Sequence, residues 1–454
     1  MSISGLNRIE KKAAFSLATV FGLRMLGLFM ILPVFAIYGT QLEGYTPLWL
    51  GLAIGAYGLT QALLQIPMGI LSDKFGRKPI ILFGLLVFLA GSIVAATSTT
   101  IYGVVFGRAL QGMGAIASAV LALAADLSRE DQRPKVMATI GMFIGLSFTV
   151  SMVIGPVVAE SYGLAGLFWL TGFLTILAMF MVQFVVPSSV SKAPKGDHLA
   201  IPAQVKKLIT QSQLWRLNVG VFVLHMVLTA SFVTLPKLFV NAGLSLDHHW
   251  MMYLPTLFGS FFLMVPFMIW ALKKQKEKQM FVAAVGLFLL TMLLLAFLPN
   301  TLTLLIVAMV MFFTAFNYLE ATMPSMLSRL APAGVKGSAM GVFTSSQFFG
   351  AFCGGLIGGL VAEQWSEHAI FYVMSGFACF WLYAAMGMKA MKKSKSYSFS
   401  IQSDSEENTE LLADKIVAMP GVVEATLVHS EAVAYLKLDD KVADIVAIKA
   451  LLKS

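Results

Sequence analysis

The chain has 454 residues, of which 58% are hydrophobic and only 12% are charged. Soluble domains carry about 25% charged residues, so this composition excludes an ordinary soluble protein and indicates an integral membrane protein. The net charge of +9 does not indicate a nucleic-acid partner, because Lys and Arg lie in short segments between apolar runs, as topology signals do.

The N-terminal segment, residues 1–12, is polar and basic, and the apolar run after it is too long for a signal-peptide core. We expect this apolar run to be a first transmembrane helix that is retained in the protein. Both cysteines, Cys353 and Cys379, fall inside apolar runs, so neither a disulfide nor a thiolate metal site is predicted.

Twelve runs are long and apolar enough to span a lipid bilayer, which needs about 20 mostly apolar residues each. They lie near 14–38, 48–72, 79–98, 101–127, 136–160, 165–187, 216–240, 249–272, 280–299, 302–328, 337–362 and 368–389. Alternate connections, near 39–47, 99–100, 161–164, 241–248, 300–301 and 363–367, contain no Lys or Arg. The positive-inside rule therefore predicts that both termini are cytoplasmic. An odd helix count would instead scatter bases on both sides.

The longest connection, 188–215, divides the spans into two sets of six, 1–187 and 216–389. Two short matches relate the halves. Residues 154–160 resemble 357–363 at an offset of 203, and 127–129 repeat at 327–329 at an offset of 200. Duplicated halves with a site between them are a transporter architecture. Chance similarity of apolar strings is the alternative.

After a linker at 390–395, residues 396–454 are predicted to form a small cytoplasmic domain. Strands are expected at 396–402, 422–428 and 432–438, and helices at 409–419 and 442–452, an order typical of ferredoxin-like folds. The stretch 419–425 resembles the heavy-metal-associated domain family, whose metal loop holds Cys-x-x-Cys. The corresponding loop, 403–408, has no cysteine, so the fold is expected without the metal. A unit this small could be stabilised by a partner, by the helix bundle or by a second copy.

A charged loop interrupts the apolar sequence between the second and third spans, at residues 69–79. Gly69 permits close helix approach and Gly76 a tight turn. Asp73 can accept hydrogen bonds from a helix N-terminus, and Arg77, followed by Lys78, can pair with Asp126 at the end of the fourth span. The alternative is that the loop is only a topology signal, but such a signal would need the basic residues and not the acid or the two glycines.

The pattern Gly-x-Leu-x-Asp-x-x-Gly-Arg-Lys closely resembles the signature loop of the major facilitator superfamily of secondary transporters. The resemblance implies that Asp73 meets the eleventh helix, beginning near Gly337, and that the loop latches the two halves together on the cytoplasmic side. The second-half loop, 273–278, lacks the pattern, so the latch is expected to be one-sided.

Four ionisable residues lie well inside apolar runs: Arg24, Arg108, His225 and Glu320, in the first, fourth, seventh and tenth spans. Each is costly at depth unless it faces water or a partner, so we expect the four to line one polar cavity. In the resembling family these helices do line the central cavity. Isolated structural roles are the alternative for each residue.

Chemical roles differ among the four. Arg108, with Gln111 after it, resembles the family's helix-four motif Arg-x-x-x-Gly, implicated in proton coupling; a buried arginine stays charged and would tune a neighbouring acid. Glu320 is the expected proton carrier, because burial favours the protonated carboxyl. His225 could titrate or be a satisfied core imidazole. Arg24 and Glu320 could contact substrate instead.

The fifth span carries small residues suited to close packing, including Gly145, Ser151, Gly155 and Pro156. Its end resembles the antiporter motif Gly-x-x-x-Gly-Pro-x-x-Gly-Gly, with Ser151 at the first glycine and Ala159-Glu160 at the last pair. Residues 32–36 resemble the first-helix motif of twelve-helix drug:proton antiporters, with Ala36 where a second proline is usual.

The sequence thus predicts an all-α polytopic membrane protein with a small C-terminal α+β domain, a transporter rather than an enzyme. The resemblance implies a proton-coupled carrier of the bacterial inner membrane that exports small apolar or drug-like compounds by alternating access, driven by protons without a cofactor. A proton-driven importer of sugars or other solutes, or a sensor reading a ligand through its C-terminal domain, are the alternatives. The substrate is not specified.

Overall fold

The computed structural model describes residues 5–129, 132–187, 210–299, 301–331, 336–389, 395–401, 412, 415–428, 433–438 and 442–452. Its elements are α1 (Arg8–Phe29), α2 (Leu32–Tyr38), η1 (Gly39–Gln41), α3 (Pro47–Phe75), α4 (Arg77–Thr97), α5 (Ile101–Met113), α6 (Ala117–Asp126), α7 (Arg133–Phe184), α9 (Ser212–Phe232), α10 (Leu235–Asn241), η3 (Leu246–His248), α11 (His249–Lys274), α12 (Glu277–Phe297), α13 (Leu302–Leu330), α14 (Lys336–Gln364), α15 (Ala369–Met386), β1 (Lys395–Ser400), β2 (Val422–Val428), β3 (Val433–Leu438) and α17 (Ile445–Leu451).

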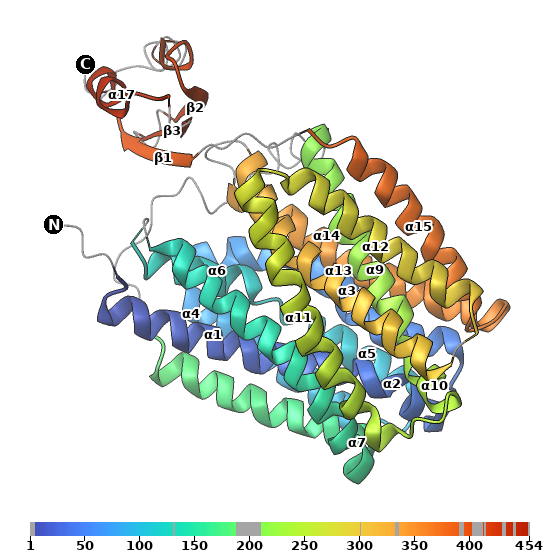
Figure 1. The fold of residues 1–454 in the computed structure, drawn as a ribbon. Coiled ribbons are helices and arrows are strands. Elements are labelled where there is room, and N and C mark those ends of the chain that lie inside the picture. Colours follow the sequence, from blue (N-terminus) through green and yellow to red (C-terminus); the bar gives the residue numbers. More distant parts are fainter. Residues whose placement is uncertain are drawn as a thin grey trace.

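Eleven helical segments of the described chain are long and apolar enough to cross a membrane. One of them, α7, has 52 residues and turns back at Gly163, whose φ of +62° is not helical (Figure 1). Because glycine adopts positive φ without strain, α7 makes two passes, and the described helices account for the twelve predicted spans. The seventh span begins at Ser212, inside the predicted linker, most of which lies outside the described residues.

The first, fourth and seventh spans are each broken into two helices, α1/α2, α5/α6 and α9/α10. Prolines lie in the first turn of α2 and α10, where no helical N–H is lost. Broken helices free backbone carbonyls at membrane depth, and these must find partners inside the protein. Figure 1 shows α2, α10 and the turn of α7 together at one end of the bundle. We call this end, formed by residues 39–46, 161–164, 242–248 and 365–368, the outer end, following the predicted orientation.

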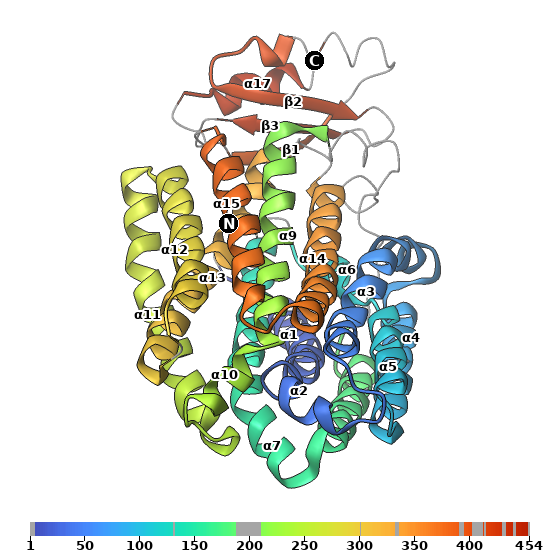
Figure 2. The same cartoon turned by 90° about the vertical axis from the view of Figure 1, so that its right-hand side faces the viewer.

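Helices α3 and α14, one from each half, pack together through glycines. A Cβ built on Gly51 would lie 2.1 Å from the carbonyl oxygen of Gly355, and one on Gly55 would lie 2.8 Å from that of Phe352. Only glycine allows backbones to approach this closely. Helix α14 also packs against α9, so it lies between α9 and α3 (Figure 2).

The buried apolar side chains of the bundle form two clusters, one within the first half and a larger one that includes both halves. In the C-terminal segment, β3 lies between β1 and β2 and pairs antiparallel with both. Ile416, Leu436 and Ile448 are buried in a separate small core. Of the helix predicted at 409–419, the structure describes residues 412 and 415–419, with 415–417 helical; the turn predicted at 429–431 lies outside the described residues.

Candidate functional site

Two buried arginines of the first half lie beside one tyrosine. Arg24 on α1 and Arg108 on α5 are 1% and 2% exposed, and their guanidinium carbons lie 5.7 and 5.2 Å from the centre of the Tyr57 ring. Arg24 donates to Gln61 Oε1 at 2.7 Å and to the Gly114 carbonyl, freed by the break between α5 and α6, at 3.0 Å. A cation near an aromatic face is favourable, and more so when water is excluded.

Arg108 donates to Gln111 Oε1 at 2.8 Å, and Gln111 donates to the Ser92 hydroxyl. Neither arginine forms an ion pair within the described chain. These contacts enclose both guanidinium groups among the helices of the first half. The Tyr57 ring, beside which both guanidinium groups lie, is 6.0 Å from the Phe348 ring of α14, and the cavity shared with the second half stays a prediction.

The two ionisable residues of the second half meet in a cluster with a glutamine. His225 Nε2 on α9 lies 3.7 Å from Glu320 Oε2 on α13. Gln347 on α14 lies between them: its Nε2 is 2.8 Å from His225 Nε2 and 3.3 Å from Glu320 Oε1. The Glu320 side chain is 40% exposed and that of His225 is 12% exposed, so the cluster is open on the carboxyl side.

The hydrogen bonds assign the tautomer of His225. Its Nδ1 lies 3.1 Å from the Val221 carbonyl, which can only accept, so Nδ1 carries the proton. In the neutral ring Nε2 is then an acceptor, and it takes one N–H of Gln347. The glutamine amide thus offers one N–H to the imidazole and the other to the carboxylate.

Aromatic side chains connect this cluster to the first half. The Phe316 ring, one turn before Glu320, lies 5.7 Å from the His225 ring and 6.4 Å from Phe148 of α7. Phe148 in turn lies 5.0 Å from Phe29 of α1. These apolar contacts cross between the halves next to the titratable pair.

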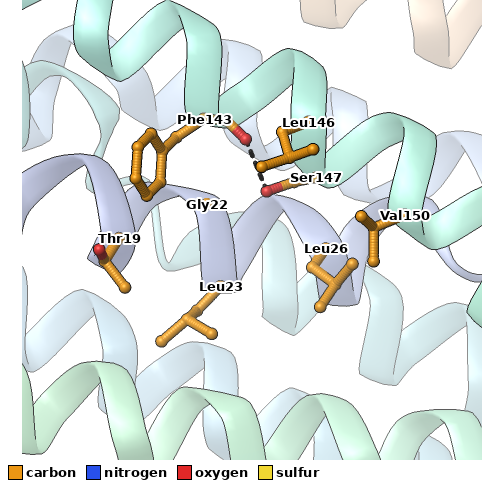
Figure 3. Close-up of a pocket in the computed structure, with 8 residues that line it drawn as sticks. All are labelled: Thr19, Gly22, Leu23, Leu26, Phe143, Leu146, Ser147 and Val150. Atoms are coloured by element: carbon orange, nitrogen blue, oxygen red, sulfur yellow. Dashed lines mark hydrogen bonds between the residues drawn. The ribbon is translucent and has the colours of Figure 1, made fainter. Parts of the chain in front are cut away.

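An apolar pocket of about 190 Å³ lies between α1 and the first pass of α7 (Figure 3). The pocket contains few polar groups. One of them, the Ser147 hydroxyl, donates a hydrogen bond to the Phe143 carbonyl at 2.7 Å. The lining residues are Thr19, Gly22, Leu23, Leu26, Phe143, Leu146, Ser147 and Val150. Such a lining suits an apolar group rather than a charged one.

The charged loop between α3 and α4 forms a compact ion cluster. Gly76, with φ +97°, ends α3, and Arg77 begins α4. Arg77 pairs with Asp73, donates to Asp126 Oδ2 at 3.1 Å and donates to the Ser72 hydroxyl at 2.7 Å. Lys78 follows in the first turn of α4. A Cβ on Gly69 would lie 3.2 Å from the Ser118 hydroxyl of α6, so α3 and α6 approach closely there.

All of these loop contacts lie inside the first half. The described contact of Asp73 is with Arg77, and residues 332–335, just before α14, lie outside the described chain. The described cluster therefore ties the second, third and fourth spans to one another, and the predicted latch to the start of the eleventh helix falls partly outside the described residues. In the second half, Glu277 at the start of α12 pairs with Arg329 near the end of α13; this pair also lies inside one half, so the one-sided latch stays a prediction.

The described polar contacts that join the halves near their ends lie at the outer end. Glu363, at the end of α14, accepts from Leu48 N at 2.8 Å and from the Thr46 hydroxyl at 2.9 Å, both at the start of α3. Lys237 of α10 donates to Glu367 at 2.6 Å and to the Tyr45 hydroxyl at 3.2 Å. We call these residues the outer seam.

The fifth-span motif packs at only part of its length. A Cβ on Gly155 would lie 2.5 Å from the Met30 carbonyl, at the break between α1 and α2, and Pro156 is buried beside it. Ser151 is buried and donates to the carbonyl of its own helix at Phe148. Gly145 has nothing within 4 Å of a built Cβ, so the close packing expected there is absent.

Sequence reasoning missed the neutral and interfacial members of these sites: Gln61, Gln347, Lys237 and Glu367. An uncharged glutamine carries no charge whose burial would be costly, and Lys237 lies near the end of its apolar run rather than well inside it. Glu363 did lie in one of the repeated segments. Within the described chain, no group of three or more His, Cys, Asp or Glu is placed to hold a metal.

Comparison with known proteins gives one consistent result. Residues 17–352 and 249–417 match the family model described as Major Facilitator Superfamily. The chain is 41% identical over 435 residues to the inner membrane transport protein YajR of Escherichia coli (strain K12), covering 96% of each chain. It is 28% identical over 220 residues to the quinolone resistance protein NorA of Staphylococcus aureus, covering 47% of this chain and 55% of that one. The crystal structure of the human organic anion transporter MFSD10 has the same fold, with a TM-score of 0.62 and 19% identity, covering 83% of this chain and 99% of that one.

Proposed function

The chain belongs to the major facilitator superfamily, and from this premise we propose that it is a proton-coupled exporter of small apolar or drug-like compounds. As a member of that family it is a membrane transporter and not an enzyme. The bacterial inner membrane is its proposed location, in line with the printed name of its E. coli relative. Both termini are proposed to be cytoplasmic, because Lys and Arg lie in the connections on that side.

The cluster of His225, Gln347 and Glu320 carries the proposal of proton coupling. It combines the carboxyl and the imidazole of the second half's membrane interior, 3.7 Å apart and partly open to solvent. A carboxylate beside a neutral histidine can take up a proton without leaving an isolated charge in the membrane. Arg24 and Arg108, fully enclosed and without an ion pair in the described chain, are proposed to hold the first half at a fixed positive charge instead.

The apolar pocket and the aromatic contacts of Phe316 and Phe148 support an apolar substrate. A compound with an apolar body could occupy the pocket between α1 and α7 while the titratable cluster changes its protonation. The partial likeness to a quinolone resistance protein agrees with this substrate class.

Alternating access requires two sets of contacts that do not hold at the same time. The outer seam supplies one set, since Glu363 joins α14 to the start of α3 there. The glycines of α3 and α14 add close backbone contacts between the same two helices. We propose that these contacts close the transporter at the outer end. Proton uptake at Glu320 from outside and release to the cytoplasm would complete a cycle in which the compound leaves.

Two alternatives remain distinct in their consequences. An importer of sugars or other solutes would move protons and substrate in the same direction. A sensor would bind a ligand or partner through the C-terminal segment, proposed to be ferredoxin-like and open to self-association, without carrying flux.

Proteoliposomes loaded at acid pH with a pH-sensitive dye test the proposal. Addition of a quinolone from a panel of labelled compounds should raise the lumenal pH in the wild type, and this response should be lost in Glu320→Gln. Acidification of the lumen would indicate symport and overturn export. Absence of flux with every compound, together with tight ligand binding by the C-terminal segment of the full chain, would favour the sensor.

A further inference from the structure

We propose that Gln347 is a positioning residue that couples the protonation of Glu320 and His225 to the contact between the two halves. The inference rests on the proposed proton coupling. It names the residue through which a change in protonation would reach the contact between α3 and α14. Gln347 is uncharged, and its role follows from where its amide lies and from which helix carries it.

The amide uses both of its N–H groups on titratable partners. Its Nε2 lies 2.8 Å from His225 Nε2 and 3.3 Å from Glu320 Oε1. His225 is held with its proton on Nδ1 by the Val221 carbonyl at 3.1 Å, so its Nε2 is free to accept. In this arrangement the amide donates to both partners.

A proton on either partner changes what the amide can do. If Nε2 of His225 becomes protonated, it turns from acceptor to donor, and the N–H of Gln347 now faces another N–H. If Glu320 is protonated, one of its oxygens also becomes a donor. Protonation of His225 therefore requires the amide to turn its Oε1 toward the new donor or to move away, whereas Glu320 protonated on Oε2 can still accept at Oε1.

Helix α14 carries this change to the other half. Ser345, two residues before Gln347, donates to the Ala62 carbonyl of α3 at 3.1 Å. The Phe348 ring, next to Gln347, lies 6.0 Å from Tyr57 of α3. On the opposite side, a Cβ on Gly350 would lie 2.1 Å from the Phe222 carbonyl of α9. The backbones of α14 and α9 are thus in direct contact, and α14 cannot move closer to α9.

The charged surroundings of the amide are simple. Its described polar partners are His225 from α9 and Glu320 from α13. The membrane part of α3, residues 47–72, has no Asp, Glu, Lys or Arg, and α15 has none either. The other charged groups on the packed helices, Arg216 on α9 and Arg329 on α13, lie near helix ends. A pH response at this position therefore reports the pair.

Protons themselves are the probe in the test, so no substrate is needed. Spin labels at Lys74→Cys and Lys273→Cys, both exposed at the cytoplasmic ends of α3 and α11, are placed in a Cys353→Ala, Cys379→Ala background in nanodiscs. The label distance distribution is measured by electron–electron resonance between pH 5 and 9. We expect a pH-dependent change with one midpoint.

In Gln347→Leu the midpoint should move to higher pH by roughly one unit, because the carboxylate and the neutral imidazole each lose a donor that favoured the deprotonated form. Gln347→Glu should move it in the same direction, since a second carboxyl disfavours ionisation of the first. Ser346→Ala is the matched control, because the described bond of that hydroxyl is to the Val342 carbonyl of its own helix, and it should leave the midpoint unchanged.

An unchanged midpoint in both Gln347 variants, or no pH response in the parent, would overturn the coupling role. If Gln347→Leu does not give monodisperse protein, Gln347→Glu decides alone. Failure of the proposed function is distinguishable, because it would appear as a pH-dependent distance with no proton flux in the proteoliposome assay.

Discussion

Glu277, at the start of α12, is paired with Arg329, near the end of α13, with Arg329 Nη1 3.2 Å from Glu277 Oε1. Glu277 lies 200 residues after Arg77, which begins α4 and pairs with Asp126 at the end of α6. The two halves therefore have the same connection between their third and fourth spans, with the charges exchanged. The first-half signature loop is one member of a related pair of ion clusters.

Charge exchange tests the second-half pair. Glu277→Arg and Arg329→Glu alone place like charges together and should each lower the unfolding free energy by about 1–3 kcal/mol. The double variant should recover most of this loss, because contacting residues are not additive. Thermal unfolding followed by intrinsic fluorescence in detergent measures all three. Lys274→Glu, an exposed neighbour, is the control; strictly additive effects would contradict the pairing.

In the first-half cluster, Asp126 should matter more for stability than Asp73. The Asp126 side chain is 5% exposed and that of Asp73 is 21% exposed. Removing one partner of a buried pair leaves an uncompensated charge. Asp126→Asn should therefore cost roughly 1–2 kcal/mol and Asp73→Asn less than about 1 kcal/mol. Unfolding midpoints in the same detergent compare them. A larger loss in Asp73→Asn would point to a contact beyond the described residues.

Glu363→Gln should open the outer seam. The Glu363 carboxylate accepts from the N-terminus of α3, where a negative charge is favoured and a neutral amide is a weaker acceptor. Spin labels at Glu43→Cys and Asn241→Cys should show a greater population of long distances. Glu160, the counterpart of Glu363 in the repeated segment, is exposed, and Glu160→Gln should have no effect. Equal responses would mean that the seam does not depend on this carboxylate.

Filling the apolar pocket should reduce export without abolishing protonation. Leu23→Trp places a larger side chain in the space of about 190 Å³ between α1 and α7. The apparent KM for an apolar compound should rise severalfold, since the lost space removes apolar contact, while the pH response of the label distance should persist. Ile93→Trp, at an exposed position of α4, serves as the control. An unchanged KM would exclude the pocket as a binding site.

The sequence by itself determined the membrane class, the twelve spans, the two halves and the family. These follow from run length, the distribution of Lys and Arg, and the loop of Asp73, Gly76 and Arg77, all of which are local along the chain. The sequence also predicted that Arg77 could pair with Asp126. This pair forms because the start of α4 lies beside the end of α6.

Only the tertiary structure decided which face of each helix is buried. When a helix is apolar on every face, its lipid-facing and protein-facing sides have similar compositions. The periodicity of the sequence then does not show which side faces lipid and which faces protein. For that reason the sequence did not reveal that Arg24 donates to Gln61 and to the Gly114 carbonyl. For the same reason Gln347 went unnoticed, because a neutral side chain reveals its role only through the partners that folding brings to it.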